Sequence, residues 1–143
     1  MVIRFPWLLG SGSWFDWFYV RPMKNAHCVP LFGAGANLME IIDIKDAIML
    51  TLKIAKGEEP GVFNMVSAGP VTQLEFASAI SRLSNLPVCD YRKVFEGKLE
   101  KEALEAFSSN IPLKTKHSDI FKDHHYIPLD ETLREILQQS GLA

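Results

Sequence analysis

The sequence predicts a single α/β domain, in which short strands are flanked by helices. The chain has 143 residues, which is enough for one domain with its own core and too few for two of ordinary size. Hydrophobic residues make up 48% and charged residues 22%, a composition typical of globular proteins. Short apolar runs alternate with segments that carry helix-start and helix-stop signals, and this alternation predicts the α/β class.

The charge balance and the cysteine content exclude several classes of protein. The formal net charge is -2, which argues against a protein that binds nucleic acid or an anionic membrane. No apolar run approaches the roughly 20 residues of a membrane span. Cys28 and Cys89 are too few for a disulfide framework, and nothing indicates an oxidising compartment. We therefore expect a cytoplasmic protein without nucleic-acid or membrane partners.

The first apolar run predicts a buried strand at Val2–Phe5 and a turn at Gly10–Gly12. The stretch Met1–Gly10 is too short for a signal peptide and is interrupted by Pro6. Because the chain begins inside a strand, we expect further sequence upstream. We also expect an unpaired strand edge that another chain covers.

The next segment, Ser13–Val20, contains five aromatic residues. Trp14, Trp17 and Phe18 have the i, i+3, i+4 spacing of one helix face, which predicts a short helix that Pro22 ends. Core packing is the simpler explanation of such a stripe. In the alternative, the stripe lines an apolar pocket, and Trp14 and Phe18 are then candidate substrate-binding residues.

The middle of the chain carries further strand and helix signals. Ile42 and Ile44 alternate with polar residues and predict a short strand. Asp46 is then expected to cap a helix that runs to about Lys56 and ends at Gly57.

A capping box marks the next helix. It follows a strand predicted at Gly61–Val66, and its residues are Thr72–Glu75. The helix that follows is expected to bury Phe76, Ala77, Ile80 and Leu83.

The last third of the chain is less regular. A strand is predicted within Pro87–Arg92, and a charged, exposed helix over Glu96–Phe107. A polar connection separates them from a final helix, Asp130–Gln139, for which Asp130 is the expected cap.

Motifs for catalysis are weak throughout the chain. The pairs Gly10–Gly12 and Gly33–Gly35 lack the third glycine of a dinucleotide fingerprint, so both favour turns. None of the three tyrosines is followed by lysine four residues later, which excludes a Tyr-x-x-x-Lys pair within this sequence. We therefore assign no catalytic residue.

Two groups of side chains resemble metal ligands without a closed zinc spacing. The first lies within residues 117–125, where His124 and His125 are adjacent and point apart, so a solvated polar segment is favoured. The second is acidic and comprises Glu40, Asp43 and Asp46. On an alternating strand Glu40 and Asp43 would face opposite sides, so we predict no metal site.

Five short blocks, taken in order, resemble one known family. The blocks are Ile3–Gly10, Pro30–Gly35, Ile44–Ala47, Val62–Thr72 and Ile127–Leu129. Together they resemble the C-terminal half of the extended short-chain dehydrogenase/reductases, the NAD-dependent epimerase/dehydratase group. The resemblance runs from Ile3 to about Leu137.

The resemblance implies a fold and a division of labour. Residues 1–143 would form the last strands of a Rossmann-like sheet plus the small α/β substrate-binding lobe. The fingerprint that binds NAD or NADP, and the catalytic tyrosine and lysine, would lie in an upstream part. The chain would bind a nucleotide sugar or a related alcohol or carbonyl compound for hydride transfer, and be inactive alone. Its expected partner is that upstream part or a second copy of the chain.

The resemblance also suggests site residues. Pro6 would lie near the nicotinamide, Phe32 would stack on a nucleobase, and Asn64 would lie near a diphosphate. For Asn64, a bond to local backbone is an equal alternative. Met39 occupies the position where nucleotide-sugar enzymes of the family carry an arginine, so an apolar or undecorated substrate is credible. Asp46 is implied to be a structural cap.

One different class of function stays open. In it, the chain is a non-catalytic, stand-alone module that binds a partner through its aromatic face. An independent hydrolase or metal enzyme has almost no support among the residues.

Overall fold

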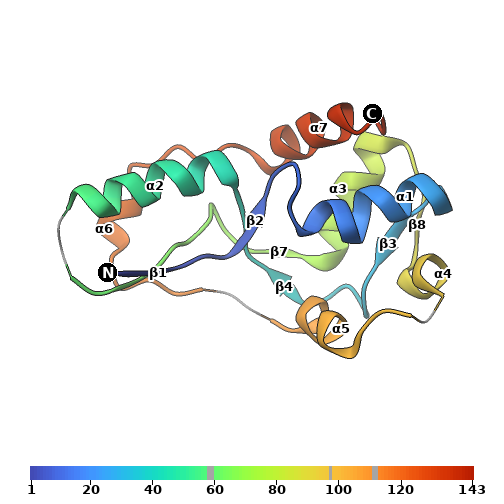
Figure 1. Cartoon of the computed structure of the whole chain (residues 1–143), viewed down its shortest axis with the longest axis horizontal. Coiled ribbons are helices and arrows are strands. Elements are labelled where there is room, and N and C mark those ends of the chain that lie inside the picture. The colour runs from blue at the N-terminus through green and yellow to red at the C-terminus, as the bar shows by residue number, and fades with distance from the viewer. Residues whose placement is uncertain (58–59, 97, 111–112) are drawn as a thin grey trace.

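The computed structural model describes residues 1–57, 60–96, 98–110 and 113–143. It is a mixed α/β structure in which strands and helices alternate along most of the chain (Figure 1), as predicted. None of the helices in these ranges is long and apolar enough to cross a membrane.

The described strands form two-stranded sheets, and most of these sheets are parallel. Three parallel pairs join strands that are far apart in the sequence: β1 (Val2–Arg4) with β6 (Val62–Asn64), β2 (Trp7–Leu9) with β5 (Ile41–Asp43), and β3 (Val29–Leu31) with β8 (Val88–Asp90). The fourth pair, β4 (Leu38–Met39) with β7 (Val71–Thr72), is antiparallel. Parallel pairing requires long crossover connections, and helices occupy much of these.

The helices gather at the two ends of an elongated molecule (Figure 1). At one end lie α2 (Ile44–Lys56) and α6 (Ser118–Phe121), next to β1. At the other end lie α1 (Arg21–Ala26), α3 (Gln73–Ser84), α4 (Tyr91–Phe95) and α5 (Lys101–Ser108). The last helix, α7 (Leu129–Gln139), packs on α3.

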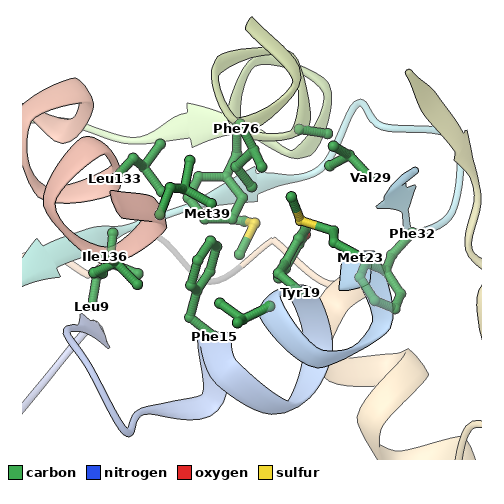
Figure 2. Close-up of a cluster of buried hydrophobic side chains, with 14 of the residues drawn as sticks. Leu9, Phe15, Tyr19, Met23, Val29, Phe32, Met39, Phe76, Leu133 and Ile136 are labelled. Carbon is green, nitrogen blue, oxygen red and sulfur yellow. The ribbon is translucent and has the colours of Figure 1, made fainter. Parts of the chain in front are cut away.

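Two hydrophobic clusters stabilise these ends. The larger one, the aromatic core, is shown in Figure 2 and includes Leu9, Phe15, Tyr19, Met23, Phe32, Met39, Phe76 and Leu133. The smaller one, the α2 core, comprises Ile42, Ala47, Leu50, Ile54, Phe63, Met65 and Phe121. Each buried large side chain contributes roughly 1.5–3 kcal/mol relative to an exposed one, so both clusters stabilise their ends substantially.

The capping box is confirmed. The backbone N–H of Glu75 donates to the Thr72 hydroxyl at 3.1 Å, and the Glu75 carboxylate accepts from the Thr72 N–H at 2.7 Å. The helix α3 buries Phe76, Ala77 and Ile80, as predicted, while Leu83 is half-buried.

The expected cap of α2 is wrong by one helical turn. Asp43 is the cap, because its carboxylate accepts from the backbone N–H of Lys45 at 2.7 Å. Ile44, predicted as strand, is therefore the first helical residue, and Asp46 lies inside the first turn. The predicted end at Lys56 and Gly57 is confirmed.

Pro22 does not end the aromatic helix. The backbone first forms a π-helical turn, η1 (Asp16–Val20), in which the N–H of Arg21 donates to the Asp16 carbonyl. Such a turn alters the carbonyl positions against which a proline ring would clash in a regular helix. The helix continues through Pro22 to Ala26, where His27 adopts a left-handed conformation with φ 52.

The buried face of this helix also differs from the predicted stripe. Phe15 and Tyr19 are completely buried, whereas Trp14 and Phe18 are half-buried. Trp17 is 59% exposed, and the Arg21 guanidinium lies 3.6 Å from the centre of its ring. Of the predicted stripe, Trp14 and Phe18 therefore pack partly against the aromatic core, while Trp17 stays exposed.

The strand at Val2–Phe5 is present as β1, but it is not buried. Val2 is 54% exposed, and Phe5 is exposed as well. Among the described residues β1 pairs with β6 alone, which leaves its other edge open.

Two predictions for the last third need correction. The helix expected at Glu96–Phe107 is present only as α5, which begins at Lys101, since Glu96 has φ 49 and ends the preceding helix α4. Phe107 is buried rather than exposed. The final helix is confirmed to within one residue, but Asp130 does not cap it. Its carboxylate pairs instead with the Arg82 guanidinium at 2.7 Å.

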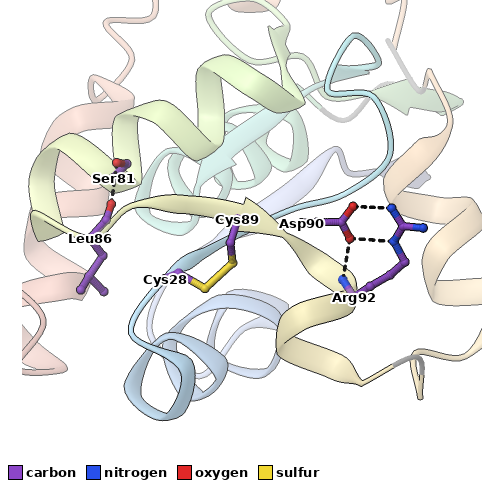
Figure 3. The surroundings of a disulfide bond; sticks show 6 residues. All are labelled: Cys28, Ser81, Leu86, Cys89, Asp90 and Arg92. Carbon is purple, nitrogen blue, oxygen red and sulfur yellow. Dashed lines mark hydrogen bonds and ion pairs between the residues drawn. A yellow bond between two sulfur atoms is a disulfide. The ribbon is translucent and has the colours of Figure 1, made fainter.

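Cys28 and Cys89 form a disulfide beside β3 and β8 (Figure 3), with their Cα atoms 6.0 Å apart. Because disulfides persist mainly in oxidising compartments, the bond counts against the expected cytoplasmic location, which stays a prediction. Next to it, hydrogen bonds from Arg92 lower the pKa of the Asp90 carboxyl to about 2.

We predict that reducing the Cys28–Cys89 bond destabilises the chain. The two cysteines are separated by 61 positions, and cross-linking a loop of this length contributes roughly 4 kcal/mol in the chain-entropy account. Dithiothreitol should lower the melting temperature by about 10 °C. The double variant Cys28→Ser, Cys89→Ser is the control and should melt identically with and without reductant. Wild-type melts that do not respond to reductant would contradict this prediction.

Candidate functional site

A cavity of about 430 Å³ opens where the connection between β1 and β2 meets the start of the aromatic helix. We call it the tryptophan cavity, and its walls are Phe5, Pro6, Trp7, Leu8, Trp14 and Leu113. Its volume lies within the range of roughly 300–1,000 Å³ that is typical of ligand sites. Two of the predicted site residues, Pro6 and Trp14, therefore come together in one cavity.

Both indole rings of the cavity are held by aromatic neighbours. The ring centres of Trp7 and Trp14 lie 4.8 Å apart in an edge-on arrangement, and Trp7 stacks on Phe107 at 5.1 Å. The Trp14 Nε1–H donates to the Leu8 carbonyl at 2.8 Å. These contacts connect the cavity wall directly to the aromatic core, so its shape is set by packing.

A buried carboxylate holds the Leu113 part of the wall. Glu40 is 4% exposed, and its carboxylate accepts from the Leu113 N–H at 2.7 Å and from the Ser67 N–H at 3.0 Å. The backbone carbonyl of Glu40 also accepts from the Trp7 N–H at 2.9 Å. Sequence reasoning missed this role, although a glutamate between the apolar residues Met39 and Ile41 was a usable signal.

Two further buried carboxylates continue along the same stretch of chain. Asp43 accepts from the Thr132 hydroxyl at 2.6 Å. Asp46 lies 2.8 Å from the His124 Nε2 and accepts from the Ile127 N–H at 2.8 Å. We call Glu40, Asp43 and Asp46 the carboxylate row. Each member holds a different part of the segment between residues 113 and 132.

The expectation that residues 117–125 form a solvated segment is wrong for two of its histidines. The His124 side chain is 11% exposed and bound to Asp46, and the His117 ring packs on Phe63 at 4.4 Å. Asp119 and His125 are exposed, as predicted. Within the described ranges, no three His, Cys, Asp or Glu side chains are placed to hold a metal ion.

Neither Tyr19 nor Tyr126 has the lowered pKa of an activated phenol. Burial raises the pKa of Tyr19, whose hydroxyl is bound to the Gln73 side chain. Burial and the carboxylates of Asp46 and Glu40 also raise the pKa of Tyr126. A raised pKa opposes deprotonation, so neither phenol suits a role as general base near neutral pH.

Phe32 and Phe18, two other predicted site residues, lie outside the tryptophan cavity. Phe32 is completely buried and stacks on Phe107 at 4.3 Å and on Tyr91 at 5.6 Å. Phe18 packs edge-on against Phe107 at 4.8 Å. Their rings contribute to the aromatic core, and their roles toward a substrate stay predictions.

Met39 and Asn64 are likewise separate from the cavity walls. Met39 is 2% exposed in the aromatic core. The Asn64 Nδ2 donates to the Lys114 carbonyl at 2.7 Å, while its Oδ1 is buried and has no partner among the described residues. Because Lys114 follows Leu113, Asn64 helps to position the segment that forms one cavity wall.

Neither glycine pair forms a cradle for the phosphates of a dinucleotide. The Gly12 N–H donates to the Asp16 carboxylate at 2.8 Å, so a phosphate at this turn would meet a negative charge. The second pair has φ 64 at Gly33 and 78 at Gly35, and Gly35 accepts from the Leu74 N–H. Neither of these two turns is therefore suited to hold the phosphates of a dinucleotide.

Comparison with known proteins gives the fold. No family model and no curated protein sequence matches the chain. Among solved structures, it is similar to the UDP-glucuronic acid 4-epimerase of Bacillus cereus in complex with UDP-glucuronic acid and NAD, with a TM-score of 0.70 and 15% identity. That match covers 97% of this chain and 45% of the epimerase.

Two other solved structures also have a similar fold. The dTDP-glucose 4,6-dehydratase of Bacillus anthracis in complex with NAD matches with a TM-score of 0.68 and 16% identity, covering 96% of this chain and 43% of the dehydratase. A human epimerase family protein with NADPH matches with a TM-score of 0.68 and 19% identity. This match covers 96% of this chain and 48% of the human protein. The chain thus has the fold of epimerase and dehydratase structures and spans less than half of their length.

We predict that Asp46→Ala destabilises the chain by about 3 kcal/mol. The substitution leaves two partly buried hydrogen-bonding groups, the His124 ring and the Ile127 N–H, without their partner. Urea unfolding measures the loss. Asp119→Ala, in the same segment but exposed, is the control and should change stability by less than about 0.5 kcal/mol. The double variant with both Asp46→Ala and His124→Ala tests whether the two side chains interact. If its loss of stability equals the sum of the two single losses, Asp46 and His124 are not energetically coupled and the prediction is wrong.

We also predict that Met39→Arg is strongly destabilising, by about 3 kcal/mol or more, because the guanidinium would enter the aromatic core. Met39→Leu conserves volume and should cost less than about 1.5 kcal/mol. Thermal melts with and without UDP-glucose separate two interpretations. An arginine variant that melts like the wild type and binds UDP-glucose would place this position in a substrate site instead.

Proposed function

We propose that this chain is the substrate-binding portion of an NAD(P)-dependent epimerase, dehydratase or reductase, and that it acts together with a dinucleotide-binding domain. The substrate would be a nucleotide sugar or a related alcohol or carbonyl compound. The bound cofactor supplies hydride transfer at the alcohol or carbonyl carbon. The residues of this chain bind and orient the substrate and exclude water from the tryptophan cavity.

The observation that carries the proposal is the extent of the structural match. The fold of the Bacillus cereus epimerase is reproduced over 97% of this chain, while less than half of the epimerase is covered. That protein binds NAD and a nucleotide sugar in its structure. A chain with part of this fold, in which neither glycine turn forms a phosphate cradle, is suited to the substrate side of the same reaction.

A second observation is the exposed apolar surface of α2. Ile44, Ile48 and Leu52 follow each other at intervals of four residues and therefore lie on one face of the helix, away from the α2 core. With Phe5 and Leu8 they line a shallow cavity of about 300 Å³. We call these five residues the α2 surface. A helix that is apolar on two faces is typical of one buried between two bodies.

The open edge of β1 adds to the α2 surface. Val2 and Val62, on the two paired strands, are both exposed, and the free edge offers backbone groups to a further parallel strand. A dinucleotide-binding domain has the parallel sheet and the helices that would cover both features. In its absence, we expect a second copy of the chain to cover them.

The alternative of a stand-alone module has weaker support. It requires an accessible aromatic face, and two residues of the predicted stripe, Trp14 and Phe18, pack partly against the aromatic core. Trp17 remains as one exposed aromatic residue on that helix, and its ring is partly covered by Arg21.

We predict that the wild-type chain associates through the α2 surface at high concentration. Ile48→Glu with Leu52→Glu should give a monomer with an unchanged melting temperature, since both side chains are exposed. Light scattering measures the mass. Leu74→Glu, an exposed apolar position on α3, is the matched control and should leave association intact.

The same samples test whether the isolated chain binds the cofactor by itself. In calorimetry, neither NAD nor NADP should bind the isolated chain with a Kd in the low micromolar range, equivalent to about -8 kcal/mol. Saturable binding of that strength would refute the proposed function. A wild-type chain that stays monomeric at high concentration would refute the role of the α2 surface.

A further inference from the structure

We propose that the tryptophan cavity binds an uncharged, flat apolar group, so that the substrate is an aromatic alcohol or carbonyl compound rather than a nucleotide diphosphate. The assignment as a substrate rests on the proposed function. The preference for an uncharged ring rests on the walls of the cavity alone.

The walls offer apolar surface and no charge. Of the six residues that line the cavity, all are aromatic, aliphatic or proline. Rings stack favourably on or against indoles in offset and edge-on geometries. Trp7 and Trp14 meet at an interplanar angle of 68° and present two differently oriented ring surfaces. A flat ligand can therefore contact one indole face-on and the other at its edge.

Three hydrogen-bond donors of the cavity wall are already committed. The Trp14 Nε1–H is bound to the Leu8 carbonyl, the Trp7 N–H to the Glu40 carbonyl, and the Leu113 N–H to the Glu40 carboxylate. Pro6 has no N–H to donate. A diphosphate needs several strong donors to replace its hydration, and these groups cannot supply them without breaking existing bonds.

The charge behind the wall also disfavours an anion. The Glu40 carboxylate is buried and bound directly to the backbone of Leu113. A carboxylate at this depth is poorly screened by salt and repels a nearby diphosphate. Arg4 and Lys114 are the exposed cations next to wall residues in the sequence. If the cavity binds a diphosphate after all, its affinity must depend on these two side chains.

The cavity is also organised before any ligand arrives. Trp14 lies within 6.1 Å, between ring centres, of Phe15, Tyr19, Phe76 and Phe107. Side chains held in this way lose little conformational entropy on binding. The affinity for a small flat ring is therefore expected to be measurable in the chain as it is.

The test titrates the full chain with 2-naphthalenemethanol, an uncharged flat alcohol, and separately with UDP-glucose, by calorimetry. We expect saturable binding of the naphthalene compound with a Kd of about 100 μM or tighter, and none of UDP-glucose. Phe5→Ala, at a half-exposed wall position, should weaken binding about tenfold, and Leu113→Arg should weaken it at least as much. Arg4→Gln with Lys114→Gln is the matched control and should leave Kd unchanged.

Each contrary result has a distinct meaning. Saturable UDP-glucose binding that is lost in the Arg4 and Lys114 variant overturns the ligand class and leaves the proposed function standing. Naphthalene binding that is absent up to about 1 mM, or that ignores both wall variants, overturns the cavity assignment. The proposed function fails separately, through the NAD and NADP titrations. Melting curves of Phe5→Ala and Leu113→Arg exclude unfolding as the cause of lost binding.

Discussion

Three buried carboxylates, Glu40, Asp43 and Asp46, connect the centre of this molecule to its C-terminal third. Burying an ionised carboxylate is costly unless donors surround it, and here each one accepts from groups between residues 113 and 132 or close to its own helix start. The segment 113–128 has little regular structure and few buried apolar side chains of its own. Its position therefore depends on these polar contacts, and so does the Leu113 wall of the tryptophan cavity.

The same stretch separates the two hydrophobic clusters. Met39, just before the row, belongs to the aromatic core, while Ala47, just after it, belongs to the α2 core. The continuous run 39–47 thus contributes a side chain to the aromatic core, binds the C-terminal segment and begins α2, the helix that carries the α2 surface. This arrangement places an apolar cavity suited to a small ligand next to a surface suited to a second protein body, with Phe5 and Leu8 belonging to both.

Local signals allowed the secondary structure to be predicted better than the site. The Thr72 capping box and the Gly57 helix end depend on neighbouring residues, and both were correct. Two of the errors involve partners distant in sequence: the Cys28–Cys89 bond has no local signal, and His124 is largely buried because Asp46 lies against it. Of the predicted site residues, Pro6 and Trp14 line the cavity, whereas Phe32 and Met39 lie in the core, because spacing alone does not distinguish an aromatic or apolar wall from packing.

The parallel strand pairs have a consequence for the order of folding. Val2 is aligned with Val62, and Val29 with Val88, so the early strands find their partners after roughly half of the chain has been synthesised. Forming contacts this distant in sequence requires the closure of large loops. The entropy cost of closure is incurred before the contacts stabilise the chain, and this slows folding. The aromatic segment that follows Gly12 is then present on the ribosome without the α3 and α7 side chains that bury it. A nascent chain of this protein therefore exposes its aromatic segment until both helices have been synthesised.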